Sequence, residues 1–305
     1  MKLIFASRLL LLCLLLVWSS AISNPQNSSK SAHSKSNDDG ALLEVGRGSQ
    51  VSLEPLTTAA PTQLKIVSYN IRWRGGKELQ ELIKLFREDA EIGGSTVLGL
   101  QEVDRGKKRS GNQNNALRIA QELNLHYAWA APPGPKAGKE EETGVALLSP
   151  YELMDVRRIV LPHPGPGKRR RAAIGATIEV GKTRFRIYSV HSETRIATKK
   201  KIEQMQAVLD DLAHYPKEMP AIILGDLNTW EPGSGDDTRK LFKSANFHTP
   251  FNGDSTFCRR LLLFDLKLKL DWMWLRGFKS HRHGIDQEID ISDHWPLWAV
   301  VEPLR

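Results

Sequence analysis

Cysteine is almost absent from this sequence, which contains only Cys13 and Cys258. Cys13 lies in an apolar run near the N-terminus, so removal of that run would leave Cys258 as the one remaining thiol. One thiol cannot form an internal disulfide, even in an oxidising compartment. The sequence also has no internal repeat. We therefore expect a fold without disulfide bonds.

Acidic residues are outnumbered, with 35 Asp and Glu against 43 Lys and Arg, which gives a formal net charge of +8. This balance favours anionic partners such as nucleic acid, phosphorylated small molecules or an acidic membrane face, but it does not choose among them. A hydrophobic content of 40% and a charged content of 26% are typical of a soluble globular protein. At 305 residues, the chain is long enough for one large domain or two small ones.

Long apolar runs are missing except near the N-terminus, where residues 9–18 carry no charge. This run is shorter than the roughly 20 apolar residues that span a bilayer. It follows Lys2 and Arg8 and precedes small residues that end at Ser23, which is the pattern of a secretory signal peptide. We predict a signal peptide over residues 1–23 and a secreted, periplasmic or cell-envelope location. An uncleaved membrane anchor is the alternative.

Apolar residues are also scarce in residues 24–62, where Ser, Asn, Gly and Lys dominate. Such a segment buries too little surface to offset the entropy lost on ordering. We predict a flexible linker over residues 24–62 and a single folded domain over residues 63–303.

The predicted domain alternates short, β-rich apolar runs with segments that have helical periodicity. Strands are predicted at residues 64–70, 96–100, 144–149, 172–180, 184–190, 221–224, 270–275 and 297–301. Helices are predicted around residues 79–86, 112–125 and 202–212. The chain is therefore expected to mix helices with many short strands.

Polar or ionisable side chains follow directly after, or lie directly before, many of these strands. The residues in question are Asn70, Glu102, His191, Asp226, Asn228, Asp293 and His294. Asn and Asp at strand ends are commonly turn formers. Five such strand ends in one domain make coincidence a poor explanation, and polar groups at the ends of buried strands gather at one edge of a sheet.

The motifs at these positions resemble those of one known family. They are Tyr69-Asn70, Leu100-Gln101-Glu102, Val190-His191-Ser192, Gly225-Asp226-Leu227-Asn228, Leu270-Asp271-Trp272 and Ser292-Asp293-His294. In this order they resemble the endonuclease/exonuclease/phosphatase superfamily, also called DNase I-like. The resemblance implies an α+β fold, a two-layered β-sandwich flanked by helices in four α/β/β/α layers, with the site at one edge of the sheets.

Three of these residues offer oxygen ligands for a metal. Asn70, Glu102 and Asp293 supply amide and carboxylate oxygens, which suit Mg²⁺ or Mn²⁺ better than zinc. Magnesium keeps several waters and binds phosphate oxygens, so a sparse set of protein ligands is expected. The resemblance implies that Glu102 is the principal ligand.

The resemblance also implies roles in catalysis. His294 would be the general base on the attacking water, and Asp271 would orient its ring. Asp226 is the alternative proton acceptor, and Asp226 and Asn228 would position the nucleophile and the phosphoryl oxygens. His191, in its protonated form, would bind the developing charge or assist the leaving oxygen.

The substrate is less well defined by the sequence. Arg169, Arg170 and Arg171 lie in a basic loop, and a second basic run covers residues 105–109. We expect the three arginines to hold substrate phosphates, without reading base sequence. The alternative is a solvated charged face. No long exposed apolar hairpin, of the kind that would enter a bilayer, is evident in the sequence.

These observations predict a secreted or envelope-located, Mg²⁺-dependent phosphoesterase that hydrolyses phosphodiester bonds in a nuclease-like reaction. The first alternative is a phosphatase or phospholipase-type hydrolase acting on phospholipid, inositol phosphate or sphingolipid head groups. The second is a binding module without catalysis, which would have no need of the complete set of site residues. We expect the protein to bind a phosphodiester substrate, for which nucleic acid is one candidate. We also expect it to be a monomer without an obligate protein partner.

Overall fold

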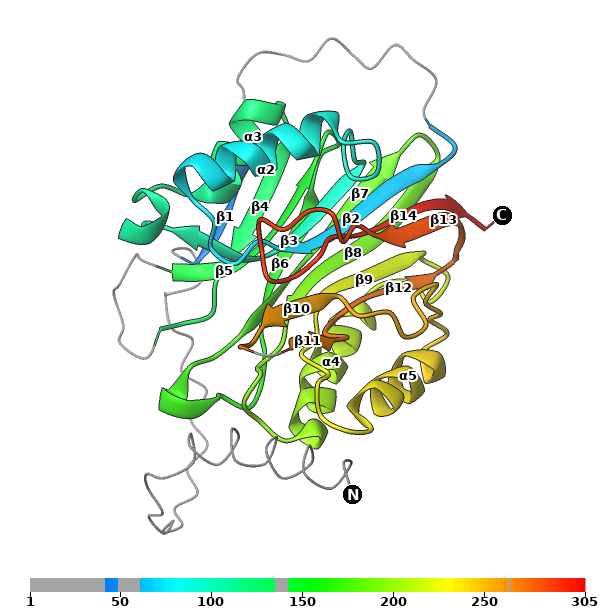
Figure 1. Cartoon of the computed structure of the whole chain (residues 1–305). Coiled ribbons are helices and arrows are strands. Elements are labelled where there is room, and N and C mark those ends of the chain that lie inside the picture. Colours follow the sequence, from blue (N-terminus) through cyan, green and yellow to red (C-terminus); the bar gives the residue numbers. More distant parts are fainter. Residues whose placement is uncertain (1–41, 49–60, 135–141, 263, 305) are drawn as a thin grey trace, which may run out of the picture. The chain divides into compact units, whose positions relative to one another are not determined.

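The apolar runs form two β-sheets that pack against each other (Figure 1). The structure, a computed structural model, describes residues 42–48, 61–134, 142–262 and 264–304. Residues 37–305 belong to one compact unit. The predicted signal peptide over residues 1–23 lies outside the described residues.

Seven strands make the first sheet and five make the second. In spatial order, the first contains β1 (Leu43–Arg47), β4 (His126–Ala130), β5 (Glu142–Ser149), β3 (Val97–Arg105), β2 (Leu64–Asn70), β14 (Leu297–Pro303) and β13 (Phe278–Ile285). The second contains β12 (Asp271–Arg276), β9 (Ala221–Asp226), β8 (Thr183–His191), β7 (Ala172–Val180) and β6 (Met154–Val160). A separate pair, β10 (Phe257–Arg260) and β11 (Asp265–Leu268), forms a two-stranded hairpin.

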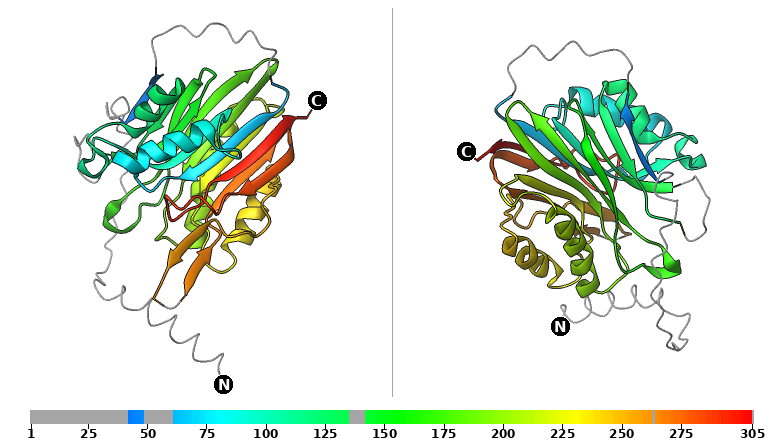
Figure 2. Two further views of the ribbon diagram at one scale, coloured as in Figure 1. Left: turned by 45° about the horizontal axis from the view of Figure 1, so that its top comes forward. Right: turned by 180° about the vertical axis from the view of Figure 1, so that it is seen from behind.

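Helices cover the outer face of each sheet (Figure 2). The helix α2 (Gly76–Glu88) and the helix α3 (Asn115–Leu123) pack on the first sheet. The helix α4 (Thr198–Leu212) and the helix α5 (Ser234–Ser244) pack on the second. The predicted α+β sandwich with four α/β/β/α layers is therefore confirmed.

The continuous apolar character of the strands follows from this layering. In β2, Leu64 and Ile66 face the core between the sheets, whereas Val67 and Tyr69 face the helices. Successive side chains of a strand point to opposite faces, and here both faces are covered. Strands that are covered on both faces, such as β9, therefore carry apolar residues at nearly every position.

Two parallel strand pairs place the ends of four strands at one edge of the sandwich. β2 runs parallel to β3, with Asn70 beside Gln101, and β8 runs parallel to β9, with His191 beside Asp226. The antiparallel strand β12 begins at the same edge, because Asp271 pairs with Asp226. Polar residues at these ends are thus brought together by the strand register.

The predicted linker over residues 24–62 is wrong at residues 42–48, because residues 43–47 form β1. This strand pairs with β4 over five residues, and the Tyr127 hydroxyl donates to Glu44 Oε1 at 2.6 Å. Leu42 is buried in the core beneath the helices. Pairing with β4 at the edge of the sheet stabilises this segment, and the polar composition of the segment did not predict such pairing.

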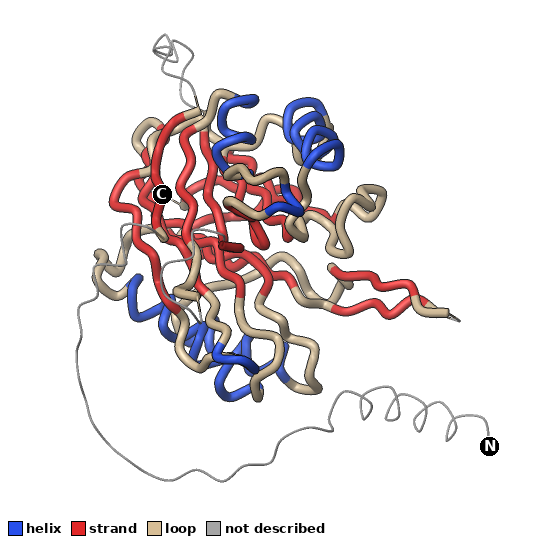
Figure 3. Tube along the Cα trace, turned by 90° about the vertical axis from the view of Figure 1, so that its left-hand side faces the viewer, coloured by secondary structure: helices blue, strands red, loops and turns tan. Residues whose placement is uncertain are grey.

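The expected absence of an exposed apolar hairpin is also wrong. β10 and β11 extend away from the sandwich as an arm (Figure 3). Leu262 near its tip is fully exposed, and Phe264 is about half exposed, at 49%. The sequence around them contains no Gly or Pro to mark a turn, and no hairpin was predicted there. Within the described ranges, no helix is long and apolar enough to cross a membrane.

The close approach of the two sheets depends on Gly99 in β3. A Cβ atom at this position would lie 2.1 Å from Leu224 Cδ1 of the opposite sheet. We predict that Gly99→Ala lowers the free energy of unfolding by about 1–3 kcal/mol, because extra volume in a packed core forces strain. Urea unfolding measures this loss. Gly235→Ala in α5 is the control, since its Cβ would lie 3.6 Å from its nearest neighbours, and an equal loss in both variants would contradict the prediction.

Candidate active site

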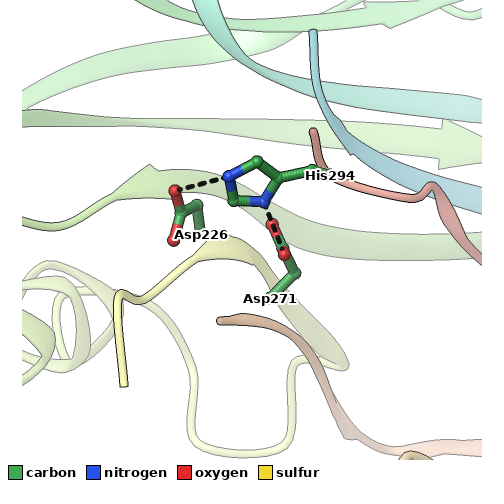
Figure 4. A group of neighbouring side chains, drawn as sticks. All are labelled: Asp226, Asp271 and His294. Carbon is green, nitrogen blue, oxygen red and sulfur yellow. Dashed lines mark hydrogen bonds and ion pairs between the residues drawn. The ribbon is translucent and has the colours of Figure 1, made fainter. Parts of the chain in front are cut away.

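A buried histidine lies between two buried aspartates at the edge where these strand ends meet (Figure 4). His294 Nδ1 is 2.8 Å from Asp271 Oδ2, and His294 Nε2 is 3.8 Å from Asp226 Oδ2. Burial alone would lower the pKa of His294, but Asp271 and Asp226 outweigh it and raise this pKa to about 10. The Nδ1–H···Asp271 bond fixes the ring so that Nε2 faces Asp226.

Asp271 is itself held by Thr256, a residue that no sequence motif singled out. The Thr256 hydroxyl donates to Asp271 Oδ2 at 2.7 Å. The same hydroxyl oxygen accepts the backbone N–H groups of Leu270 and Asp271 at 3.0 and 2.9 Å. The ring of Phe257 contacts the His294 ring edge-on, with centroids 5.0 Å apart. The orientation of the imidazole is thus set on two sides.

Asp226 depends on the glycine before it. Gly225 has a φ of +133°, and a Cβ there would lie 2.0 Å from the carbonyl oxygen of Val190. The Asn70 side chain donates to Asp226 Oδ2, and the Asn228 backbone N–H donates to Oδ1, both at 3.0 Å. Burial raises the pKa of Asp226 to about 7, with His294 acting in the opposite direction.

Glu102 reaches the site because of a β-bulge. The pairing of β3 with β5 shifts by one residue at Glu102, whose φ is +55°. Bulges redirect side chains next to active sites, and this one places Glu102 Oε1 3.9 Å from His191 Nε2. Burial raises the pKa of Glu102, although Arg171 and His294 oppose it.

Three oxygen-bearing side chains lie where a metal could bind. Among the described residues, Glu102 has no ion pair with Lys or Arg, so its half-buried carboxylate is offset only by the more distant charges of Arg171 and His294. Asn70 and Asp293 lie close to it, and the Asp293 carboxylate is 3.3 Å from Arg72 Nη1. A carboxylate that is only partly compensated and lies beside other oxygen donors fits a hard divalent cation.

The side chain of Asn228 forms hydrogen bonds to the neighbouring loop that contains Ser192 and Thr194. Its Oδ1 accepts from the Thr194 hydroxyl, and its Nδ2 donates to the Ser192 carbonyl, both at 3.0 Å. The buried Lys201 of α4 donates to the Asn228 carbonyl at 2.7 Å and to Glu231 at 2.6 Å. The sequence did not single out Lys201, because it follows two other lysines and resembles a solvated helix face.

His191 differs from the expectation of a protonated imidazole. Arg171 Nη1 lies 3.3 Å from His191 Nδ1, and burial together with Arg171 holds the pKa of His191 well below its ordinary value. The ring is therefore neutral. Because a guanidinium only donates, Nδ1 is the acceptor and the proton lies on Nε2, which is 3.6 Å from Asp226 Oδ2.

The basic loop also differs from the expected phosphate-binding patch. Arg169 and Arg171 both form ion pairs with Glu193, at 3.4 and 3.3 Å, and the Glu193 side chain is fully buried. Arg170 is exposed. The predicted trio is therefore divided, with Arg171 inside the site, Arg169 bound to Glu193 and Arg170 on the surface.

Glu193 makes the stability of the fold depend on pH. Burial would raise its pKa, but Arg171 and Arg169 outweigh this effect and lower it. A carboxylate with a depressed pKa stabilises the fold above its ordinary pKa of 4.5, and this contribution is lost as pH falls further.

We predict that Glu193→Gln lowers the free energy of unfolding at pH 7 by about 3 kcal/mol, because Arg171 loses its buried partner. The difference from wild type should shrink as the pH falls below 4.5. Urea unfolding across this pH range tests it, with Glu78→Gln, which removes an exposed ion pair to Arg74, as the control. A loss that is constant with pH would contradict the role of Glu193.

Comparison with solved structures shows the same fold in other proteins. A protein of unknown function from Enterococcus faecalis V583 matches with a TM-score of 0.63 at 19% identity, covering 79% of this chain and 100% of that one. D. rerio TDP2, complexed with a single-strand DNA product, matches with a TM-score of 0.62 at 12% identity, covering 79% and 100%. The human Nocturnin catalytic domain with bound sulfate matches with a TM-score of 0.60 at 19% identity, covering 79% and 94%.

No curated protein matches the sequence. The family model of the endonuclease/exonuclease/phosphatase family matches residues 67–294, a range that contains the buried cluster of Asp226, Asp271 and His294. The chain belongs to the endonuclease/exonuclease/phosphatase family.

Proposed function

We propose that this protein is a divalent-metal-dependent phosphoesterase that hydrolyses phosphodiester bonds. The observation that carries the proposal is the hydrogen-bonded pair of His294 and Asp271, which lies 3.8 Å from the buried Asp226. A positioned imidazole with an orienting carboxylate is suited to move a proton to or from a reacting water. The family's chemistry of phosphoester hydrolysis agrees with this arrangement.

Each side chain of the site has a task in this reaction. With its pKa raised to about 10, His294 is protonated at neutral pH, so its Nε2–H donates to the attacking water. Asp226, the second group within reach of the same position, is then the one that can accept the proton of that water. Neutral His191 donates a hydrogen bond from Nε2–H to a phosphoryl oxygen, and Arg171 keeps that tautomer in place. Asn228 orders the loop that carries Asp226.

Glu102, Asn70 and Asp293 would hold the metal ion, for which Mg²⁺ is the expected species and Mn²⁺ the alternative. When bound, such an ion polarises a phosphoryl oxygen and offsets the charge that develops in the transition state. The carboxylate of Glu102 contributes most, because it is half-buried and forms no ion pair with Lys or Arg among the described side chains.

We predict that EDTA abolishes phosphodiester hydrolysis and that Mg²⁺ or Mn²⁺ restores it. Glu102→Gln should weaken metal binding more than about tenfold, since even residues that only support metal ligands contribute 10- to 100-fold. Isothermal titration with Mn²⁺ measures the affinity without relying on activity. Glu179→Gln, at an exposed position of β7, is the control. Full activity after exhaustive chelation would contradict the proposal.

Nucleic acid is one candidate substrate. The net charge of +8 favours a polyanion, and the similar D. rerio TDP2 structure contains a single-strand DNA product. With Arg169 and Arg171 bound to Glu193, the basic loop offers the exposed Arg170 and Lys168 to a phosphate backbone.

A phospholipid head group is the second candidate, and one specific observation favours it. The hairpin of β10 and β11 carries the fully exposed Leu262 at its tip and adjoins the site at its base, where Phe257 contacts His294. An exposed apolar tip on an element whose base adjoins the active site suits a lipid surface.

A panel of plasmid DNA, RNA, phospholipid vesicles and a small soluble phosphodiester separates these candidates. We predict Mg²⁺-dependent hydrolysis of the small phosphodiester, and His294→Ala should reduce kcat on the order of 100-fold or more. If nucleic acid is the substrate, Arg170→Ala should flatten the salt dependence of DNA binding by about one unit of log–log slope. Hydrolysis of vesicle lipid alone would assign the head group, and no hydrolysis of any substrate would reject the proposed activity.

Location remains part of the proposal. Residues 1–23 have the pattern of a signal peptide, so the mature protein is expected to begin near Asn24, outside the cytoplasm, as a monomer. Intact Met1 in a membrane fraction would instead favour an anchor.

A further inference from the structure

The hairpin of β10 and β11 combines features that the sandwich does not explain. Its two strands pair in register from Phe257 opposite Leu268 to Arg260 opposite Asp265. Strands of four residues rise about 3.3 Å per residue, so the hairpin extends about 13 Å beyond its base. Figure 3 shows this arm projecting away from both sheets.

The tip of the hairpin is apolar and in solvent. Leu262 is 103% exposed, Phe264 49% and Leu261 37%, so three of the six large exposed apolar side chains among the described residues lie within four positions. Clustered exposed apolar residues of this kind mark an interaction site. Nothing in the packing of the domain requires them.

Cations surround this apolar tip. Arg259, Arg260 and Lys267 lie on the strands, against the single acid Asp265, which is 3.5 Å from Arg260. An apolar tip with cationic flanks matches the two layers of an anionic bilayer, acyl chains within and negatively charged head groups outside. A groove on a protein surface would not require an apolar hairpin tip with basic residues on the two flanking strands.

The base of the hairpin is joined to the active site. The Cys258 N–H donates to the Asp293 carbonyl, and the Trp295 N–H donates to the Thr256 carbonyl, both at 2.8 Å. Lys267 Nζ lies 5.7 Å from the centroid of the Trp295 ring. The hairpin is thus fixed on both sides of His294, and a surface that receives the tip lies at a set distance from the site.

We propose that the hairpin tip formed by Leu261, Leu262 and Phe264 inserts into the interface of an anionic phospholipid bilayer. Amphipathic interfacial elements bury their apolar side about 5–10 Å into the boundary between head groups and acyl chains. Arg259, Arg260 and Lys267 then contact the head groups. Binding of this kind needs no catalysis, so it stands apart from the proposed activity.

The test is cosedimentation of the full chain, in EDTA, with phosphatidylcholine vesicles that contain or lack phosphatidylserine. Wild type should bind the phosphatidylserine vesicles, and Leu262→Asp with Phe264→Asp should bind about 100-fold or more weakly, because two apolar side chains no longer enter the interface. Arg259→Gln, Arg260→Gln and Lys267→Gln together should remove the preference for phosphatidylserine, at about fivefold per cation.

Leu304→Asp is the matched control. This residue is 59% exposed and follows the end of β14 opposite to His294, so its substitution should leave vesicle binding unchanged. All variants keep the same N-terminal residues 9–18, so a difference between them reports on the hairpin alone. Hydrolysis of a small soluble phosphodiester should be the same in the tip variant and wild type.

Three results would overturn the proposal. The first is that wild type binds neither kind of vesicle. The second is that the tip variant binds as tightly as wild type, a result that would assign binding to the N-terminal run. The third is that light scattering shows a dimer for wild type and a monomer for the tip variant. The tip would then bind a second copy of the chain.

Discussion

One oxygen atom of Asp226 joins the parts of this site. Its Oδ2 accepts from Asn70 of the first sheet at 3.0 Å and lies 3.6 Å from His191 and 3.8 Å from His294. That position exists only because residue 225 is a glycine, since a Cβ there would lie 2.0 Å from the Val190 carbonyl oxygen. Three features therefore depend on one another at this position. They are the parallel register of β8 and β9, the distance between the two sheets and the geometry of the site.

Charge balance is the second constraint. Burial raises the pKa values of both Asp226 and Glu102, since a low-dielectric interior penalises every uncompensated carboxylate. Within the protein, Arg171 offsets part of this charge and also holds the neutral tautomer of His191. Glu193 in turn compensates Arg171. The remaining negative charge is what makes the site suitable for a divalent cation.

Much of the fold followed from the sequence, because strands buried on both faces are apolar at nearly every position and end in polar residues. The gathering of Asn70, Glu102 and His191 at one edge was predictable for that reason, whereas the four-layer sandwich was implied by the resemblance of the motifs to the endonuclease/exonuclease/phosphatase family. β1 was not predictable, because its stability comes from pairing with β4, a contact distant in sequence.

The missed site residues share a different cause. Thr256 and Glu193 act on other side chains, Asp271 and Arg171, and such contacts have no signature in local spacing. Lys201 is the same kind of residue, a lysine whose buried amine supports the Asn228 carbonyl. Hydrogen-bond partners at a sequence distance of 15 to 30 residues are defined by the fold, so a pattern of single positions does not reveal them.

The hairpin and the reacting groups form one hydrogen-bonded unit. Thr256, immediately before β10, bonds Asp271, and the N–H of Cys258 bonds the carbonyl of Asp293. Phe257 completes the contact through the ring of His294. An enzyme that acts on a head group must hold its proton-transferring atoms at a fixed depth relative to the bilayer, and small displacements of reacting groups reduce rates strongly. If the hairpin contacts a bilayer as proposed, its direct connection to the residues that orient His294 meets that requirement without a further domain.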